Sequence, residues 1–337
     1  MRVLFFLFFF SVLQAADPIL ELAHKAFGEQ KFDNALYLYE KALSQGANRA
    51  IVYFNMANIH FIKTNTSLAV YYYREVIKSA PFFKDSYLNL GKIYYLYENY
   101  SEALDLFRAY HNIEPSDHET IMLLGDVMRK LRMYPQAEKY YRLAAANDPA
   151  VSDPYLALAF LYRELEDLPR ATAVVEEGLA QARNENLLEL QADLYRDQGM
   201  FREAAAVFEI LLLYGTNRDT EKTCRIYYQM ADAFFAGGYS YLAADALQKS
   251  LTIKADDDKT AEFLGYIYFT SGRMDDALDF YFSRFPVSRA MAYQGIKKIF
   301  INAYNNDEQG LLKKITQFYR QNGIRDELYD LVAETGI

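Results

Sequence analysis

Apolar residues recur every three to four positions along most of the chain, in runs that short polar turns separate. This spacing puts the apolar side chains on one face of an α-helix and predicts a series of amphipathic helices. The pattern also repeats over a longer period, which indicates a stack of similar structural units. A small residue opens an apolar run at successive intervals of 34, 34, 34, 34, 33, 39 and 34 residues, at Ala35, Ala69, Ala103, Ala137, Ala171, Ala204, Ala243 and Ala277.

Each period also carries an earlier small residue, twelve positions before the first set, at Ala23, Ala57, Gly91, Gly125, Ala159, Ala192, Ala231 and Gly265. A large, mostly aromatic residue lies four positions after the later small one, at Tyr39, Tyr73, Phe107, Tyr141, Val175, Phe208, Leu247 and Tyr281. One small residue on each of two helices allows the pair to approach closely, while the large residue fills the seam. Each period therefore predicts two antiparallel helices.

The order of small, aromatic and small positions resembles the tetratricopeptide repeat (TPR) family, whose unit is a helix–turn–helix. The resemblance covers eight repeats in residues 17–286. It implies an all-α fold, a right-handed α-solenoid in which the first helix of each repeat lines a concave groove. Proline placement agrees with this register. A proline in a helix interior costs about 3 kcal/mol, and all 8 prolines fall at repeat ends or in the first turn of a helix.

The first sixteen residues differ from the repeats. Arg2 precedes an apolar run over residues 3–13, and the small residues Ala15 and Ala16 follow it. This pattern is typical of a secretory signal peptide over residues 1–16, cleaved after Ala15 or Ala16. The run is shorter than the roughly 20 apolar residues that span a membrane, so retention as an anchor is the alternative. We expect an exported protein, periplasmic or secreted, with no transmembrane span after signal removal.

Two segments depart from the repeat. A polar stretch over residues 215–223 lengthens one period, and we interpret it as a longer surface connection, with a hinge or contact loop as the alternative. After Pro286 the small-residue signature fades while helical periodicity continues. Since the last unit of a solenoid has to cover its exposed apolar flank, residues 287–337 predict a helical capping segment.

Composition limits the chemistry. The 337 residues carry 36 Lys and Arg against 45 Asp and Glu, a net charge of -9, which disfavours nucleic acid as a partner. The single Cys224 and the 4 scattered His residues offer no metal-binding spacing, and the sequence holds no phosphate-binding or nucleophile motif. We therefore expect a non-catalytic protein without a cofactor or a metal.

The second and third repeats place polar side chains where the resemblance implies the concave groove. An Asn side chain offers a donor and an acceptor that match a backbone peptide group of any sequence. Asn55, Asn58 and Asn89 therefore predict a ladder that grips an extended peptide, and the alternative is a set of ordinary solvated residues. The neighbouring residues expected in the same groove are Phe54, Phe61, Lys92 and Tyr95.

Later repeats change in character. Arg129, Arg163 and Arg196 recur at one position of successive repeats and predict a row that holds a carboxylate or backbone carbonyls. The alternative is ordinary surface pairing with Asp residues three positions earlier, at Asp126 and Asp193. Aromatic residues return in the last two repeats and predict a surface that stacks on a peptide or an apolar ligand, although periodic aromatic residues also build cores. They are Tyr228, Phe235, Tyr266 and Phe269.

These features favour a non-catalytic protein–protein interaction scaffold that binds an extended peptide or a partner surface in its groove, in cell-envelope assembly or transport. Two alternatives stay open. The aromatic groove suits a carrier or sensor of a small apolar ligand, and the ends of the solenoid suit a structural subunit that assembles into a homo-oligomer.

Overall fold

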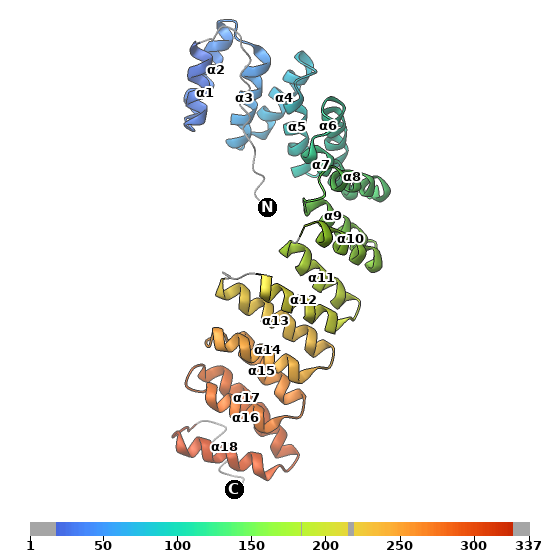
Figure 1. Ribbon diagram of the computed structural model, residues 1–337. Coiled ribbons are helices and arrows are strands. Elements are labelled where there is room, and N and C mark those ends of the chain that lie inside the picture. The colour runs from blue at the N-terminus through green and yellow to red at the C-terminus, as the bar shows by residue number, and fades with distance from the viewer. Residues whose placement is uncertain (1–17, 183, 215–218, 326–337) are drawn as a thin grey trace. The chain divides into compact units, whose positions relative to one another are not determined.

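The computed structural model describes residues 18–182, 184–214 and 219–325, and these residues form only α-helices and the connections between them (Figure 1). The helices are α1 (Pro18–Gly28), α2 (Phe32–Ser44), α3 (Arg49–Ile62), α4 (Thr66–Ser79), α5 (Lys84–Leu96), α6 (Tyr100–Ile113), α7 (His118–Lys130), α8 (Tyr134–Asn147), α9 (Asp153–Glu164), α10 (Leu168–Gln181), α11 (Glu185–Asp197), α12 (Phe201–Tyr214), α13 (Thr220–Ala236), α14 (Ser240–Ile253), α15 (Asp258–Thr270), α16 (Met274–Arg284), α17 (Arg289–Asn305) and α18 (Gln309–Gln321).

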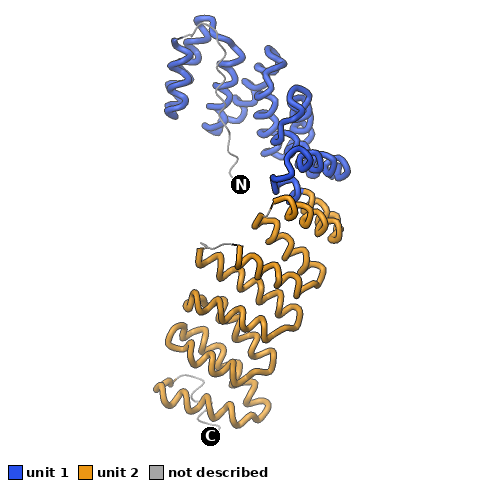
Figure 2. The backbone as a smooth tube through the Cα atoms, in the orientation of Figure 1, with its two compact units in different colours: residues 1–157 blue, residues 158–337 orange. Residues whose placement is uncertain are grey.

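Contacts between Cα atoms divide the chain into two compact units, unit 1 at residues 1–157 and unit 2 at residues 158–337 (Figure 2). The division falls inside α9. Within each unit, consecutive helices pack against each other in chain order, from α1 to α8 in unit 1 and from α10 to α18 in unit 2. The predicted all-α solenoid of two-helix repeats is confirmed in the described residues. We call the odd-numbered helix of each pair helix A and the even-numbered one helix B.

Small residues allow helix A and helix B to pack closely, as the sequence predicts. A Cβ atom added at Gly91 of α5 would lie 2.6 Å from Cε1 of Phe107 in α6. A Cβ atom at Gly125 of α7 would lie 2.6 Å from Cδ1 of Tyr141 in α8. Real Cβ atoms do not approach other atoms so closely, so the aromatic ring of helix B occupies the place of a helix-A side chain.

The turn inside each helix pair follows one geometry throughout the described chain. One turn residue has a positive φ in every pair, and these residues are Gln30, Thr64, Glu98, Arg132, Glu166, Gly199, Gly238, Gly272 and Asp307. In the second pair, the Thr64 N–H donates to the Phe61 carbonyl at 2.9 Å and the Asn65 N–H donates to the His60 carbonyl at 2.8 Å. This Schellman arrangement satisfies the carbonyls that end helix A.

The turn between α17 and α18 repeats this geometry at Asp307, so a further helix pair follows Pro286. The register counted from Asp307 places Phe300 and Leu312 where the other pairs carry small residues. The small-residue signature therefore fades in this segment although the backbone pattern continues.

Three helices of unit 2, α15, α16 and α17, meet around Tyr281. The hydroxyl end of this buried α16 residue lies between Gly265 of α15 and Gly295 of α17. A Cβ atom added at either glycine would overlap the ring. Glycine on both sides therefore lets α15 contact α17 directly, across the helix that joins them in sequence.

Parts of the sequence-based scheme lie outside the described residues. The signal peptide predicted over residues 1–16 lies there, as do residues 215–218 of the longer connection. The predicted domain boundaries stay predictions. In the part of the chain that the structure describes, no helix combines the length and the apolar character needed to cross a membrane.

Candidate functional site

The predicted groove residues occupy repeating positions on helices A. Most lie two positions before, one position after or four positions after the small residue of helix A, and we call these three positions the inner stripe. In α3 the inner stripe holds Asn55, Asn58 and Phe61, and in α15 it holds Phe263, Tyr266 and Phe269. Phe54 and Tyr228 lie one residue further toward the start of their helices.

In unit 1 the Asn residues of the inner stripe join helices to one another. Asn58 is 8% exposed, and its side-chain oxygen accepts hydrogen bonds from the Tyr73 hydroxyl of α4 and, at 3.1 Å, from the Asn89 amide of α5. Asn89 also donates to Tyr73 Oη at 3.2 Å. Asn55 donates to the Ile51 carbonyl of its own helix at 2.8 Å. Each amide of the predicted ladder thus makes a contact inside the protein, and Asn58 is buried.

The same position in the next two repeats also holds a polar residue with an internal partner. The Lys92 ammonium of α5 pairs with Glu119 of α7 at 2.6 Å. Asp126 of α7 accepts a hydrogen bond from Tyr141 Oη of α8 at 2.7 Å, and Arg129 bonds to the same hydroxyl. Burial raises the pKa of the Asp126 carboxyl, while the hydrogen bond from Tyr141 opposes this shift. The polar inner stripe of unit 1 therefore stabilises the stacking of repeats.

The predicted aromatic residues of unit 1 pack against the core. Phe54 belongs to a buried cluster, with its ring centroid 5.8 Å from that of Tyr73 and 5.0 Å from that of Phe83. Phe61 is half-buried against the same cluster. Tyr95 is half-buried as well, and burial raises its pKa to about 12. These rings therefore contribute to packing within unit 1.

The Arg row forms ion pairs between successive helices A of unit 2. Arg163 of α9 pairs with Asp197 of α11 at 2.8 Å, and Arg196 of α11 pairs with Asp232 of α13. Arg196 also lies 3.6 Å from Asp193, the residue that the sequence placed beside it. Partly exposed pairs of this kind contribute about 0.2–1 kcal/mol each. A carboxylate from the helix A of the following repeat therefore compensates the charge of each of these two guanidinium groups.

Aromatic side chains gather on α13 and α15, beside the ion pair that Asp232 of α13 makes with Arg196. The ring centroid of Phe263 lies 5.2 Å from that of Tyr228 and 5.7 Å from that of Phe235, whose ring lies 5.8 Å from Tyr266. Tyr266 is 52% exposed, and Phe269 is half-buried. The sequence pattern did not single out Phe263, although it occupies the inner-stripe position that holds Asn in α3 and α5 and could have been found by that register.

This cluster lines a hollow of about 650 Å³, which we call the aromatic hollow. Its walls include five aromatic residues and two Lys residues, namely Tyr228, Phe263, Tyr266, Phe269, Tyr281, Lys259 and Lys298. The hollow lies on the helix-A side of unit 2, and Tyr281 reaches it from α16 between its two glycines. Mostly apolar hollows of about 300–1,000 Å³ with a few polar groups are typical ligand sites.

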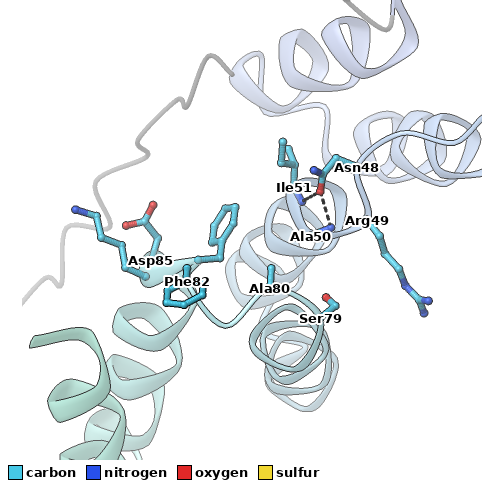
Figure 3. A pocket seen from close by; sticks show the side chains of 10 residues that line it. Asn48, Arg49, Ala50, Ile51, Ser79, Ala80, Phe82 and Asp85 are labelled. Atoms are coloured by element: carbon cyan, nitrogen blue, oxygen red, sulfur yellow. Dashed lines mark hydrogen bonds between the residues drawn. The ribbon is translucent and has the colours of Figure 1, made fainter. Parts of the chain in front are cut away.

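A second hollow, of about 610 Å³, lies in unit 1 between the start of α3 and the turn from α4 to α5 (Figure 3). Asn48 caps α3 there, because its side-chain oxygen accepts hydrogen bonds from the N–H groups of Ala50 at 3.0 Å and Ile51 at 3.3 Å. Phe82 in the wall is 86% exposed. These residues lie between repeats, outside the helix-A periodicity, so the sequence pattern did not identify them.

Comparison with known proteins agrees with the repeat. Residues 64–117, which span α4 to α6, match the tetratricopeptide repeat family. The fold is similar to that of a tetratricopeptide repeat protein from Parabacteroides merdae, with 16% identity, 74% of this chain and 97% of that chain covered, and a TM-score of 0.50. It is also similar to the C-terminal part of a TPR repeat-containing protein from Cytophaga hutchinsonii, with 14% identity, coverage of 82% and 98%, and a TM-score of 0.52.

These comparisons support a TPR protein. At such identities, the structural similarity establishes the fold alone. No curated protein matches the chain significantly. The TPR fold is generally a non-catalytic scaffold for protein interactions, so the function of this protein has to be argued from its own surface.

The side chains that could support other chemistry are dispersed. Among the described residues, no group of three or more His, Cys, Asp and Glu side chains is placed to hold a metal ion. Cys224 is buried, with its Sγ atom 3.8 Å from the Ser250 carbonyl oxygen. The His60 ring stacks on Tyr72 at a centroid distance of 5.5 Å. The aromatic hollow is therefore the strongest candidate site in the described chain.

Proposed function

We propose that this TPR protein is an exported, non-catalytic scaffold that holds an extended peptide or the surface of a partner protein on the inner stripe of unit 2. The observation that carries the proposal is the aromatic hollow, where half-buried and exposed rings line an open space of about 650 Å³. Export would place this activity in the cell envelope or outside the cell, in assembly or transport.

Aromatic side chains are well suited to such a role. They bury a large apolar area at a low cost in side-chain entropy, and they stack on apolar side chains. Tyr266 is 52% exposed, so a ligand would remove apolar surface from water at a gain of roughly 25 cal/mol per Å².

The Asn residues of unit 1 are the weaker candidate for peptide binding. Asn58 is buried, and its oxygen already accepts hydrogen bonds from Tyr73 and Asn89. A peptide that used Asn58 would first have to open this network, which costs the free energy of its hydrogen bonds. The ladder of Asn55, Asn58 and Asn89 therefore stays a hypothesis for unit 1, and the aromatic hollow is the primary site.

Site-specific crosslinking in the native host tests this proposal. A photoreactive residue at position 266 should give a discrete adduct with a partner protein. The matched control is position 241 on helix B of the same unit, where Tyr241 is 74% exposed. With the identified partner, Tyr266→Ala should weaken binding at least tenfold and Tyr241→Ala should not. Equal crosslinking from both positions would contradict a specific inner surface.

Export rests on the pattern of residues 1–16 and needs its own test. The mass of the protein purified from its host envelope or medium should correspond to a chain that begins at Ala16 or Asp17. A chain in the cytoplasm that retains Met1 would contradict export without affecting the peptide-binding proposal.

A carrier of a small apolar ligand is the second candidate, because the volume of the aromatic hollow suits one drug-sized molecule. Native mass spectrometry of protein purified from its host would show such a ligand as an added mass. That mass should be absent from Tyr266→Ala and present in Tyr241→Ala.

A further inference from the structure

The aromatic hollow combines apolar walls with two ammonium groups that have no ion-pair partner within the described part of the chain. Lys259 Nζ lies 4.6 Å from the Tyr228 ring centroid, and Lys298 is exposed on α17. Among the described residues, no carboxylate oxygen lies within 4.0 Å of either ammonium. By contrast, Lys92 and Arg196 on the inner stripe each form an ion pair. The positive charge at the hollow is therefore available to a ligand.

Carboxylates also lie near this charge: burial, with smaller contributions from Asp232, Asp257 and Glu262, raises the pKa of Tyr228, the ring beside Lys259. Glu262 is the carboxylate that lines the hollow. Asp257 caps α15 by accepting hydrogen bonds from Thr260 N–H at 3.3 Å and Thr260 Oγ1 at 2.6 Å, and Asp258 accepts one from Ser288 Oγ at 2.8 Å. The lining thus carries two positive charges and one negative charge, in a chain whose net charge is -9.

The Tyr281 hydroxyl adds a hydrogen-bond donor to this wall. At the equivalent helix-B position, the Tyr73 and Tyr141 hydroxyls donate to an inner-stripe Asn or Asp side chain. Tyr266 replaces that acceptor in α15, and the described residues give Tyr281 Oη no hydrogen-bond partner. Burial, with a smaller contribution from Glu262, raises the pKa of Tyr281 to about 12, so the phenol is protonated at neutral pH.

We propose that the aromatic hollow selects peptide segments in which an Asp or Glu side chain lies next to an aromatic or branched aliphatic side chain. The apolar side chain packs against Phe263 and Tyr266. The carboxylate interacts with Lys259 and Lys298, and the Tyr281 hydroxyl donates to an oxygen of the same segment. This inference rests on the proposed function, since it names the class of peptide that the surface accepts.

Charge complementarity decides the occupant. A basic peptide would bring like charges against the two ammonium groups, which disfavours binding. The whole chain, with its net charge of -9, attracts basic peptides nonspecifically. A preference for acidic peptides would therefore oppose the bulk electrostatics and would have to come from a local site.

Two synthetic ten-residue peptides test the inference with the full mature chain. One alternates Phe with Asp and the other alternates Phe with Lys. Both are acetylated and amidated, so that neither offers a terminal charge, and both carry a fluorophore for anisotropy. We expect the Phe–Asp peptide to bind at least tenfold more tightly at low salt, with the ratio shrinking in high salt because counterions screen exposed charges.

Single substitutions locate the effect. Lys298→Gln and Lys259→Gln should each weaken binding of the Phe–Asp peptide about three- to tenfold, as expected for the loss of one charge-assisted contact. Lys313→Gln is the matched control, because Lys313 is exposed on α18 and outside the hollow, and its substitution changes the net charge equally. Tyr281→Phe should weaken binding about threefold without shifting the thermal melt.

The outcomes separate this inference from the proposed function. If both peptides bind equally and Tyr266→Ala weakens both, the peptide scaffold stands and the acidic preference is wrong. If Lys298→Gln and Lys259→Gln behave like Lys313→Gln, the preference does not come from this hollow and the inference is again wrong. If neither peptide binds and position 266 gives no crosslink in the host, both the inference and the proposed function are wrong.

Discussion

The inner stripe of unit 1 and that of α13 and α15 in unit 2 occupy the same repeat positions and are built differently. In α3 and α5, Asn58 and Asn89 close a hydrogen-bond network with Tyr73. In α15 the same two positions hold Tyr266 and Phe263, which face an open hollow. Unit 1 thus uses these positions to hold its repeats together, whereas in α15 they line the aromatic hollow.

The comparison shows that one backbone repeat supports two uses of a position. In both units helix A and helix B pack together through the seam. The inner stripe is therefore able to carry either hydrogen bonds and ion pairs between helices or side chains that line an open hollow. If this is correct, the seam should be sensitive to substitution everywhere. Substitutions of the polar inner-stripe residues should reduce the stability of unit 1. Substitutions of the aromatic inner-stripe residues should reduce peptide binding at the aromatic hollow of unit 2.

The largest effect is expected where a seam is overfilled. In Gly295→Ala the new methyl group overlaps Tyr281, which cannot move away because Gly265 contacts its other side. We expect the free energy of unfolding to fall by about 2–3 kcal/mol, because the cost of overpacking exceeds the gain of about 1 kcal/mol in helix propensity. Gly310→Ala is the matched control, since a Cβ at this α18 position has no neighbour within 4 Å among the described residues outside its own stretch of helix. Urea denaturation followed by circular dichroism measures both, and equal midpoints would contradict the tight packing at Tyr281.

A smaller effect should distinguish the two tyrosine hydroxyls. Tyr73→Phe removes a donor to Asn58 in a buried network and should cost about 1–2 kcal/mol. Tyr281→Phe removes a hydroxyl without a partner in the described residues, so its denaturation midpoint should stay close to that of the unmodified chain. If Tyr281→Phe lost as much stability as Tyr73→Phe, the Tyr281 hydroxyl would have an internal role and the comparison of the two stripes would fail.

The pH dependence of stability should differ in sign between two carboxylates. Burial raises the pKa of Asp126, so the stability it contributes is present below the ordinary pKa of about 4 and is lost as pH rises through the raised value. Asp126→Asn keeps the acceptor for Tyr141 and stays neutral. Its stability relative to the unmodified chain should therefore increase as pH rises from about 3.5 to 7.

Asp167 at the start of α10 provides the opposite case. The hydrogen bond from Arg170 lowers the pKa of Asp167, so its contribution is present above the ordinary pKa and is lost as pH falls through the lowered value. Asp167→Asn should therefore lose stability relative to the unmodified chain as pH rises. The same trend in Asp126→Asn and Asp167→Asn would show that burial does not govern Asp126.

The sequence predicted the fold well because close packing restricts which residues can occupy the seam. Gly91 and Gly125 stand where an aromatic ring leaves no room for a side chain, and such positions are visible as a period. The additional helix pair at α17 and α18 was harder to recognise as a repeat. Its turn geometry is regular, but Phe300 replaces the small residue that marks the other repeats.

The candidate site was predictable only in part. The register identified Tyr228, Tyr266 and Phe269, since they recur on helices A. It could not identify which inner-stripe groups already have partners, because those partners lie far away in sequence. Arg196, for example, pairs with Asp232. The Asn58 side-chain oxygen likewise accepts a hydrogen bond from the Tyr73 hydroxyl of α4. Lys298 lies where the repeat signature has faded, so no register connected it with the hollow.

The smallest effect concerns the turns rather than the inner stripe, and it asks whether the two units differ in their scaffold as well. Glu98 in a unit 1 turn has a φ of 62°, and Gly272 in a unit 2 turn has a φ of 75° at the equivalent position. A side chain in this left-handed conformation costs about 1–2 kcal/mol, whereas Gly loses about 0.5–1 kcal/mol more backbone entropy on folding. Glu98→Gly should therefore stabilise the chain by about 0.5 kcal/mol, and Gly272→Ala should destabilise it by a similar amount, both measured as shifts in the urea midpoint.

Effects of equal size and opposite sign would mean that the turns are interchangeable, so the difference between the units would lie in their inner side chains alone. If Glu98→Gly destabilised the chain, the Glu98 side chain would make a stabilising contact, and the turns of unit 1 would differ from those of unit 2 in more than backbone conformation.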